Sequence, residues 1–183
     1  MPDGVLEIGS QAFSHCYIYK ITLPEGLKVI GTLAFEINNL TELEIPGTVT
    51  YIGNGAINGN YLPEEKAYIF ARNADGSIDD TTLVSYGGGN SKTVTIPSTV
   101  KIIKDGAVVR LSYADTIIIP SSVEVIENNA FHKGFWYNDS LTTIVNQTGK
   151  SFNWGNILYN TPGFEFVTGT IVSSYGNVEV VSA

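Results

Sequence analysis

Groups that carry catalytic or metal chemistry are scarce in this chain of 183 residues. Cys16 is its single cysteine, and His15 and His132 are its two histidines. One thiol forms no disulfide framework, and these three side chains complete no zinc site without carboxylate ligands. Neither histidine lies in the sequence context of a serine or cysteine nucleophile. We therefore expect no catalytic residue, no metal ligand and no cofactor, and predict that the chain is not an enzyme.

Basic residues and long apolar runs are also scarce. The chain has 10 Lys and Arg against 18 Asp and Glu, which gives a net charge of -8 at pH 7. Phosphate groups would be repelled by this charge, so nucleic acid is not expected as a partner. No apolar run approaches the ~20 residues of a membrane-spanning helix, so no membrane insertion is expected. The polar start from Met1 to Gly4 leads directly into a repeat, and we identify no signal peptide.

What the sequence does contain is a repeated phrase built around a proline and a central isoleucine. The full copies are ITLPEGLKVIGTLAF from Ile21, LEIPGTVTYIGNGAI from Leu43, VTIPSTVKIIKDGAV from Val94 and IIIPSSVEVIENNAF from Ile117, and a partial copy starts at Val5. The central isoleucines are Ile8, Ile30, Ile52, Ile103 and Ile126, spaced by 22, 22, 51 and 23 residues. A period in the low twenties is typical of a solenoid in which each repeat forms one coil.

Before each proline, apolar residues recur at positions i, i+3 and i+5, as in Ile18, Ile21 and Leu23. Side chains alternate between the two faces of a strand, so the last two of these residues share the core face. The pattern predicts one strand per coil, including residues 18–23 and 40–45, stacked as a parallel sheet and ended by the proline. If this sheet binds a partner, its outward residues are the candidate contacts: Thr22, Glu44, Thr95, Ile118 and Val145. Their character changes from polar to apolar along the array.

Two further positions of the repeat carry predictions. Gly9, Gly31 and Gly53 follow the central isoleucine, which indicates a backbone with positive φ at that position. Lys104 and Glu127 stand there in the later copies, so glycine is not obligatory. Cys16 is predicted to be a buried structural thiol, and His15, in a turn, to be solvated or hydrogen-bonded.

The interval of 51 residues contains two β-rich runs around the turn-forming segment NADGSIDD. It predicts a hairpin insertion at about 61–91 that either projects from the sheet or joins it. Asn73, Asp75 and Asp79 also match part of a calcium loop, but Ala71 and Thr82 stand where its first and last ligands belong. An Asp-Gly hairpin turn explains the same residues without an ion, and the question of an ion stays open.

Near the C-terminus the repeat phrase ends. The connection from Phe131 to Leu141 is longer than its equivalents and contains Phe135, Trp136 and Tyr137. These rings either form a binding loop or fold back to seal the core. We divide the chain into a solenoid at 1–146 and an irregular β cap at 147–183, where two strand-like runs predict a terminal hairpin.

The repeat phrases resemble the BspA-like class of bacterial leucine-rich repeats. The shared features are the proline after the strand, the Ile-Gly pair at Ile30 and Ile52, and the Ala-Phe pair at Phe35 and Phe131. The hairpin region also resembles a longer repeat variant of such proteins. The resemblance implies a right-handed, mainly β solenoid with a parallel sheet. It also implies a secreted or cell-surface setting and a role in adhesion or protein binding, although it carries over no binding residue.

The predicted function is that of a non-catalytic extracellular binding module of a bacterial surface protein. Its expected partner is a protein or glycan on a host or neighbouring cell. Two alternatives stay open: a spacer array that holds other domains, and a carbohydrate-binding surface that uses Phe135, Trp136, Tyr137 or Trp154. We also expect self-association through an exposed sheet edge at the N-terminal coil.

Overall fold

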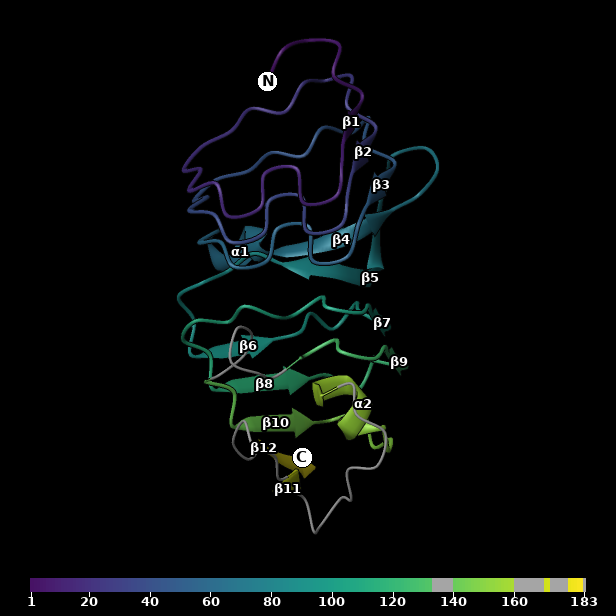
Figure 1. Ribbon diagram of the computed structural model, residues 1–183. Coiled ribbons are helices and arrows are strands. Elements are labelled where there is room, and N and C mark those ends of the chain that lie inside the picture. The colour runs from purple at the N-terminus through teal and green to yellow at the C-terminus, as the bar shows by residue number, and fades with distance from the viewer. Residues whose placement is uncertain (133–139, 160–169, 172–177, 183) are drawn as a thin grey trace.

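The chain forms a stack of solenoid coils (Figure 1). The computed structural model describes residues 1–132, 140–159, 170–171 and 178–182. The first three coils carry a short strand at the central isoleucine, and these strands pair in parallel: β1 (Glu7–Ile8), β2 (Val29–Ile30) and β3 (Tyr51–Ile52). The same position holds β7 (Ile102–Ile103) and β9 (Val125–Ile126) in the fifth and sixth coils. Each full copy of the phrase therefore forms one coil, and the predicted mainly β solenoid is confirmed.

The long interval between Ile52 and Ile103 contains a complete fourth coil, built around a hairpin. Its strands β4 (Tyr68–Arg72) and β5 (Ile78–Tyr86) are antiparallel to each other. β5 also pairs in parallel with β7, which places the fully buried Leu83 opposite Ile103. Leu83 is thus the counterpart of the central isoleucines. Of the two arrangements left open by the sequence, the hairpin joins the sheet.

A second ladder is formed by the strands that precede the prolines. β6 (Thr93–Thr95), β8 (Thr116–Ile119) and β10 (Thr143–Asn146) pair in parallel, as predicted. The predicted strands at 18–23 and 40–45 are not formed, and a hollow of about 430 Å³ is lined by residues of both segments. In the next coil a short helix, α1 (Glu64–Ala67), precedes the hairpin.

The core runs through the middle of the stack. The central residues Ile8, Ile30, Ile52, Leu83 and Ile103 are buried, as are Ala34 and Phe35 and the equivalent Ala130 and Phe131. Ile126 is only half-buried, although the repeat makes it equivalent to Ile103. The periodicity therefore identifies the core correctly, but it does not show that burial decreases at the sixth coil.

Positive φ occurs in each coil, but not where the sequence predicted it. Most left-handed residues lie at two positions of the repeat. Three positions after the central isoleucine they are Gln11, Leu33, Gly55, Gly106 and Asn129, and seven positions after it His15, Ile37, Gly59 and Arg110. The glycines after the isoleucine serve a different purpose. A Cβ on Gly31 would lie 2.5 Å from the Ser10 nitrogen, and one on Gly53 would lie 2.3 Å from the Thr32 nitrogen. These glycines let the backbones of neighbouring coils approach each other.

The C-terminal region contains α2 (Trp154–Tyr159), β11 (Thr170–Ile171) and β12 (Val178–Ser182). β12 extends the sheet by pairing in parallel with β10, and β11 pairs with β12 in antiparallel fashion. Helix α2 was not predicted; it buries Trp154, Ile157 and Leu158 against the last coil. The boundary proposed at 146 stays a prediction. Within the described ranges, the helices are too short to span a bilayer.

Candidate binding surface on the outward sheet face

Three of the predicted contact residues are neighbours on the outward face of the sheet β6-β8-β10. The register aligns Thr95 with Ile118, Ile118 with Val145, and Val145 with Val181 of β12. Thr95 is exposed, and Ile118 and Val145 are partly exposed. We call these four residues the apolar row, because only Thr95 carries a polar group. The strands that carry it lie one above another in Figure 1.

A parallel row of hydroxyl groups accompanies the apolar row. Thr93, Thr116 and Thr143 are successive partners in the same ladder, and Thr143 is aligned with Glu179. Outward threonine and β-branched side chains are what a pleated, half-exposed sheet favours. The result is a regular, flat surface with an apolar strip beside a hydroxyl strip, which suits contact with an extended partner.

The other two predicted sheet contacts, Thr22 and Glu44, are exposed in the second and third coils and line the 430 Å³ hollow. Here the surface is charged. Lys20 pairs with Glu42, and Lys66 of α1 pairs with Glu44. The hydrogen bond from Lys20 lowers the pKa of the Glu42 carboxyl. The predicted change from a polar to an apolar surface along the array is therefore present.

The predicted aromatic loop, Phe135 to Tyr137, lies outside the described residues. The fourth candidate ring for carbohydrate binding, Trp154, is buried and packs edge-on against Phe152, with ring centroids 5.4 Å apart. A ring held in this way offers no free face for stacking on a sugar.

A larger hollow, which the sequence did not predict, lies where α1 and the hairpin meet β6. It has a volume of about 740 Å3 and is lined by Glu64, Glu65, Tyr68, Phe70, Ser91, Thr93, Thr95 and Pro97. The Glu64 carboxylate accepts hydrogen bonds from the Tyr86 hydroxyl at 2.9 Å and the Ser91 hydroxyl at 3.0 Å. One feature of the sequence points to this hollow: the Ile-x-Ile-Pro phrase is missing after Leu62. In that coil, α1 takes the place of the strand. Because Thr95 belongs to both, this hollow adjoins the apolar row.

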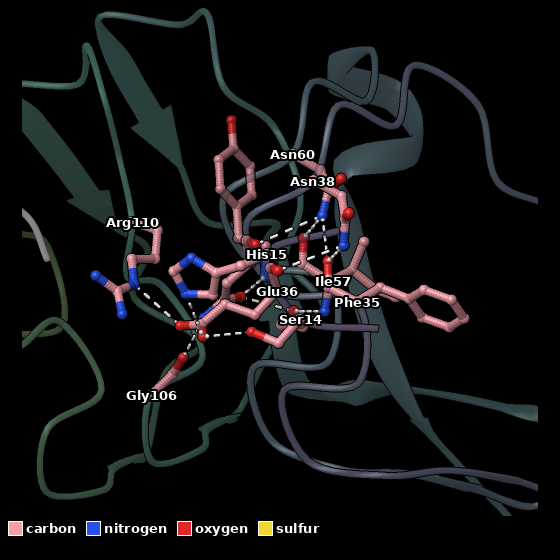
Figure 2. Close-up of polar contacts among 12 residues, drawn as sticks. Ser14, His15, Phe35, Glu36, Asn38, Ile57, Asn60, Gly106 and Arg110 are labelled. Atoms are coloured by element: carbon pink, nitrogen blue, oxygen red, sulfur yellow. Dashed lines mark hydrogen bonds and ion pairs between the residues drawn. The ribbon is translucent and has the colours of Figure 1, made fainter. Parts of the chain in front are cut away.

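A polar cluster occupies the turns that follow the central isoleucines (Figure 2). Its centre is the Glu36 carboxylate, whose side chain is only 5% exposed. Arg110, from a coil 74 residues further along the chain, donates its Nε–H to Glu36 at 3.0 Å. Ser14 donates to the same carboxylate at 3.4 Å, and the exposed His15 places Nε2 4.0 Å from it. Ser14 bonds the carboxylate rather than the imidazole, so this is not the relay of a nucleophilic site. The cluster ties the second coil to the fifth.

Beside this cluster, two asparagines satisfy backbone groups of neighbouring coils. Asn38 accepts hydrogen bonds from the N–H groups of Cys16 and Ile18 and donates to the carbonyls of Phe13 and Phe35. Asn60 has the same role in the following coil, as Figure 2 shows for its bond to Phe35.

Cys16 occupies the position that Asn38 and Asn60 hold in the following coils. It is exposed, and its thiol donates to the Ser14 carbonyl at 3.4 Å. The prediction of a buried thiol was wrong: Cys16 lies in the first coil and is exposed, whereas Asn38 and Asn60 are buried at the same position of the second and third coils.

The acidic residues of the hairpin bond to their own turns. Asp75 accepts from the backbone N–H and the hydroxyl of Ser77, and Asp79 accepts from those of Thr81. These bonds lower the pKa of both carboxyl groups. Within the described residues of the chain, no group of three or more His, Cys, Asp or Glu side chains could hold a metal ion. The hairpin-turn explanation accounts for these residues.

The repeats match a known family. The BspA type leucine rich repeat region matches this chain in six copies, over residues 1–67 and 84–153. The chain therefore belongs to this family of leucine-rich repeats. The gap between the two matched ranges, residues 68–83, covers β4, the hairpin turn and the start of β5, and residues 154–183 follow the matched part.

A solved structure supports this fold. A leucine rich cell surface protein from Faecalibacterium prausnitzii is 26% identical, with a TM-score of 0.59 over 79% of this chain and 40% of its own length. Leucine-rich repeat proteins from Bacteroides ovatus and Eubacterium ventriosum are 19% and 21% identical, each with a TM-score of 0.40, over 80% and 79% of this chain and 48% and 52% of theirs. The chain thus spans about half or less of the length of each. Among curated protein sequences, none matches.

Proposed function

We propose that this chain is a non-catalytic, protein-binding module displayed at a bacterial cell surface. The observation that supports this most directly is the apolar row, in which Ile118, Val145 and Val181 lie side by side on the open face of the sheet. Partly exposed aliphatic side chains in register, next to the hydroxyl groups of Thr116 and Thr143, offer apolar contact with polar bonds at the edge. Membership of a bacterial repeat family, and similarity to a protein described as a cell surface protein, support the proposed location.

The module would act by binding a partner over an extended surface rather than by catalysing a reaction. Solenoid repeats expose a long, regular surface, and each coil adds one strand's width of about 4.8 Å to it. A partner that lies along the sheet would meet apolar groups over the C-terminal coils and the pairs Lys20–Glu42 and Lys66–Glu44 over the N-terminal ones. Self-association is a second use of this architecture, and Leu6, Tyr17 and Tyr19 are exposed on the first coil.

The experiment compares two lysine substitutions in surface plasmon resonance against a panel of purified extracellular-matrix and cell-surface proteins. Ile118→Lys introduces a charge into the apolar row, and Val125→Lys introduces the same charge at a 46% exposed position on β9. We expect a protein that binds the wild type to lose binding to the first variant and to keep it with the second, at unchanged melting temperatures. Equal binding by both variants would place the contact elsewhere on the chain.

A further inference from the structure

The hollow between α1, β4 and β6 carries negative charge on one wall. Glu64 and Glu65, both exposed, lie at the start of α1, and the six other residues that line the hollow are uncharged. The basic residue of the same helix, Lys66, forms its ion pair with Glu44 of the preceding coil. That hydrogen bond raises the pKa of Lys66, with smaller contributions from the charges of Glu65 and Glu42. No lysine or arginine is among the residues that line the hollow itself.

The Glu64 carboxylate is held in place by neutral donors. The hydroxyls of Tyr86 and Ser91 donate to it, and the Tyr68 hydroxyl lies 2.6 Å from Glu64 Oε1. The same Tyr68 hydroxyl is 2.8 Å from the Thr95 carbonyl, so its single proton serves one acceptor at a time. Burial, together with the neighbouring Glu64, raises the pKa of both tyrosines, so they stay neutral. These bonds orient the carboxylate without cancelling its charge.

Aromatic rings form the remaining wall. Tyr68 and Phe70 are half-buried, and the Tyr68 ring packs against Tyr86 with centroids 5.0 Å apart and planes tilted by 55°. Because Tyr68 is fixed at both its ring and its hydroxyl, it would lose little freedom on binding. A ring face beside carboxylates attracts a cation through its quadrupole as well as through the carboxylate charges.

We propose that this hollow accepts a lysine or arginine side chain from a basic segment of a protein partner. This inference rests on the proposed protein-binding function and deepens it, since it names the chemistry of the partner. The charged groups of the hollow are acceptors only, and an ammonium or guanidinium supplies both the donors and the opposite charge. Thr93 belongs to the row of hydroxyl groups and Thr95 to the apolar row, so both rows start at the hollow. The rest of such a segment would continue along β6 and β8.

The test measures fluorescence anisotropy of a labelled hexa-arginine peptide at about 0.15 M salt, where the Debye length is about 8 Å. Glu64→Gln/Glu65→Gln should weaken binding about tenfold. The variant loses two partly exposed charge pairs with the arginines of the peptide and, because the arginine is held less well, part of a cation–π contact. The matched control is Asp3→Asn/Glu7→Gln, which changes the net charge equally at exposed positions of the first coil. It should leave the affinity within about twofold, because those charges lie far from the hollow on the scale of the Debye length. Phe70→Leu keeps an apolar side chain but removes the ring, and should weaken binding about threefold.

Three results would overturn the proposal. Equal weakening by the control pair would mean diffuse attraction to a chain of net charge -8. Full affinity of the Phe70→Leu variant would show that the aromatic wall of the hollow does not contribute to binding. Absence of peptide binding, with binding of a labelled chitohexaose that Phe70→Leu abolishes, would identify a sugar site instead. The proposed function is tested separately: Val145→Ser alters the apolar row on β10 without adding a charge, so it should weaken binding of the protein partner and leave hexa-arginine binding within about twofold, and either idea can fail without the other.

Discussion

The Lys104 ammonium and the Glu127 carboxylate form an ion pair between the fifth and sixth coils, at the position where the second and third coils have Gly31 and Gly53. Glu127 also accepts a hydrogen bond of 3.0 Å from the Asp105 N–H. The backbone hydrogen bond at this position is common to early and late coils: the Gly31 N–H donates to the Ile8 carbonyl at 2.8 Å, and the Glu127 N–H donates to the Ile103 carbonyl at 2.9 Å. The fifth and sixth coils therefore add a side-chain ion pair to a backbone contact that the early coils also make.

The glycine contact predicts a graded set of alanine variants. Gly31→Ala and Gly53→Ala should each destabilise the fold by about 1–3 kcal/mol, because the new Cβ would overlap the preceding backbone. Gly9→Ala is the matched control, since a Cβ there meets nothing within 4 Å. Urea unfolding would measure all three. Loss of stability in Gly9→Ala as large as in Gly53→Ala would show that the effect is not steric.

The Lys104–Glu127 pair predicts a pH-dependent contribution. Burial raises the pKa of Glu127, but the bonds from Lys104 and the Asp105 N–H outweigh it and hold the pKa below its ordinary 4.5. The stabilisation is therefore present above pH 4.5 and is lost as the pH falls through the lower folded value. Glu127→Gln should reduce the free energy of unfolding by up to about 1 kcal/mol at pH 7, since the pair is partly exposed.

The comparison needs unfolding curves of wild type and variant at several pH values. The difference between the two proteins should shrink as the pH falls well below the ordinary pKa of 4.5. A difference that stays constant over this range would mean that Glu127 acts through packing rather than charge.

Ile103 and Ile126 hold equivalent positions of the repeat but differ in burial. Ile103→Ala should cost about 2–5 kcal/mol, as expected for a fully buried side chain. Ile126 is half-buried, so Ile126→Ala should cost less than the first variant, about 1–2 kcal/mol. Thermal or denaturant unfolding of both variants measures this. Equal losses would indicate that the sixth coil is packed as tightly as the fifth.

The Glu36–Arg110 pair predicts a large effect from a residue outside the apolar core. Glu36→Ala removes the buried carboxylate that the partly buried Arg110 binds, so we expect a loss of about 3 kcal/mol, the low end for a buried pair. Ser14→Ala removes a 3.4 Å bond from the same carboxylate and should cost less than about 1 kcal/mol. Hydrogen exchange at Arg110 and its neighbours should accelerate in Glu36→Ala alone. Small and equal effects of the two variants would mean that the ion pair does not tie the coils together.

The candidate site could be predicted only to a limited extent. Alternation along a strand was enough to place Thr95, Ile118 and Val145 outward, because that periodicity is fixed by the backbone. It did not reveal the hollow at Glu64, since α1 interrupts the ladder at this coil and contacts come from Tyr86 and Ser91, more than twenty residues away. Such a site depends on how a hairpin packs against its neighbours.

The sequence alone determined the solenoid, its period, most of its core residues and the strands before Pro97 and Pro120, because these follow from local spacing that successive coils repeat. Only the tertiary structure decided how the coils meet. Gly31 proved to be a point of close approach rather than a left-handed turn, and Cys16 proved to be exposed. Leu83 completes a coil that no repeat phrase marks, and Glu36 reaches Arg110 across the stack. These relationships join residues from different coils, so their distances are set by stacking, which the order of residues within one repeat does not specify.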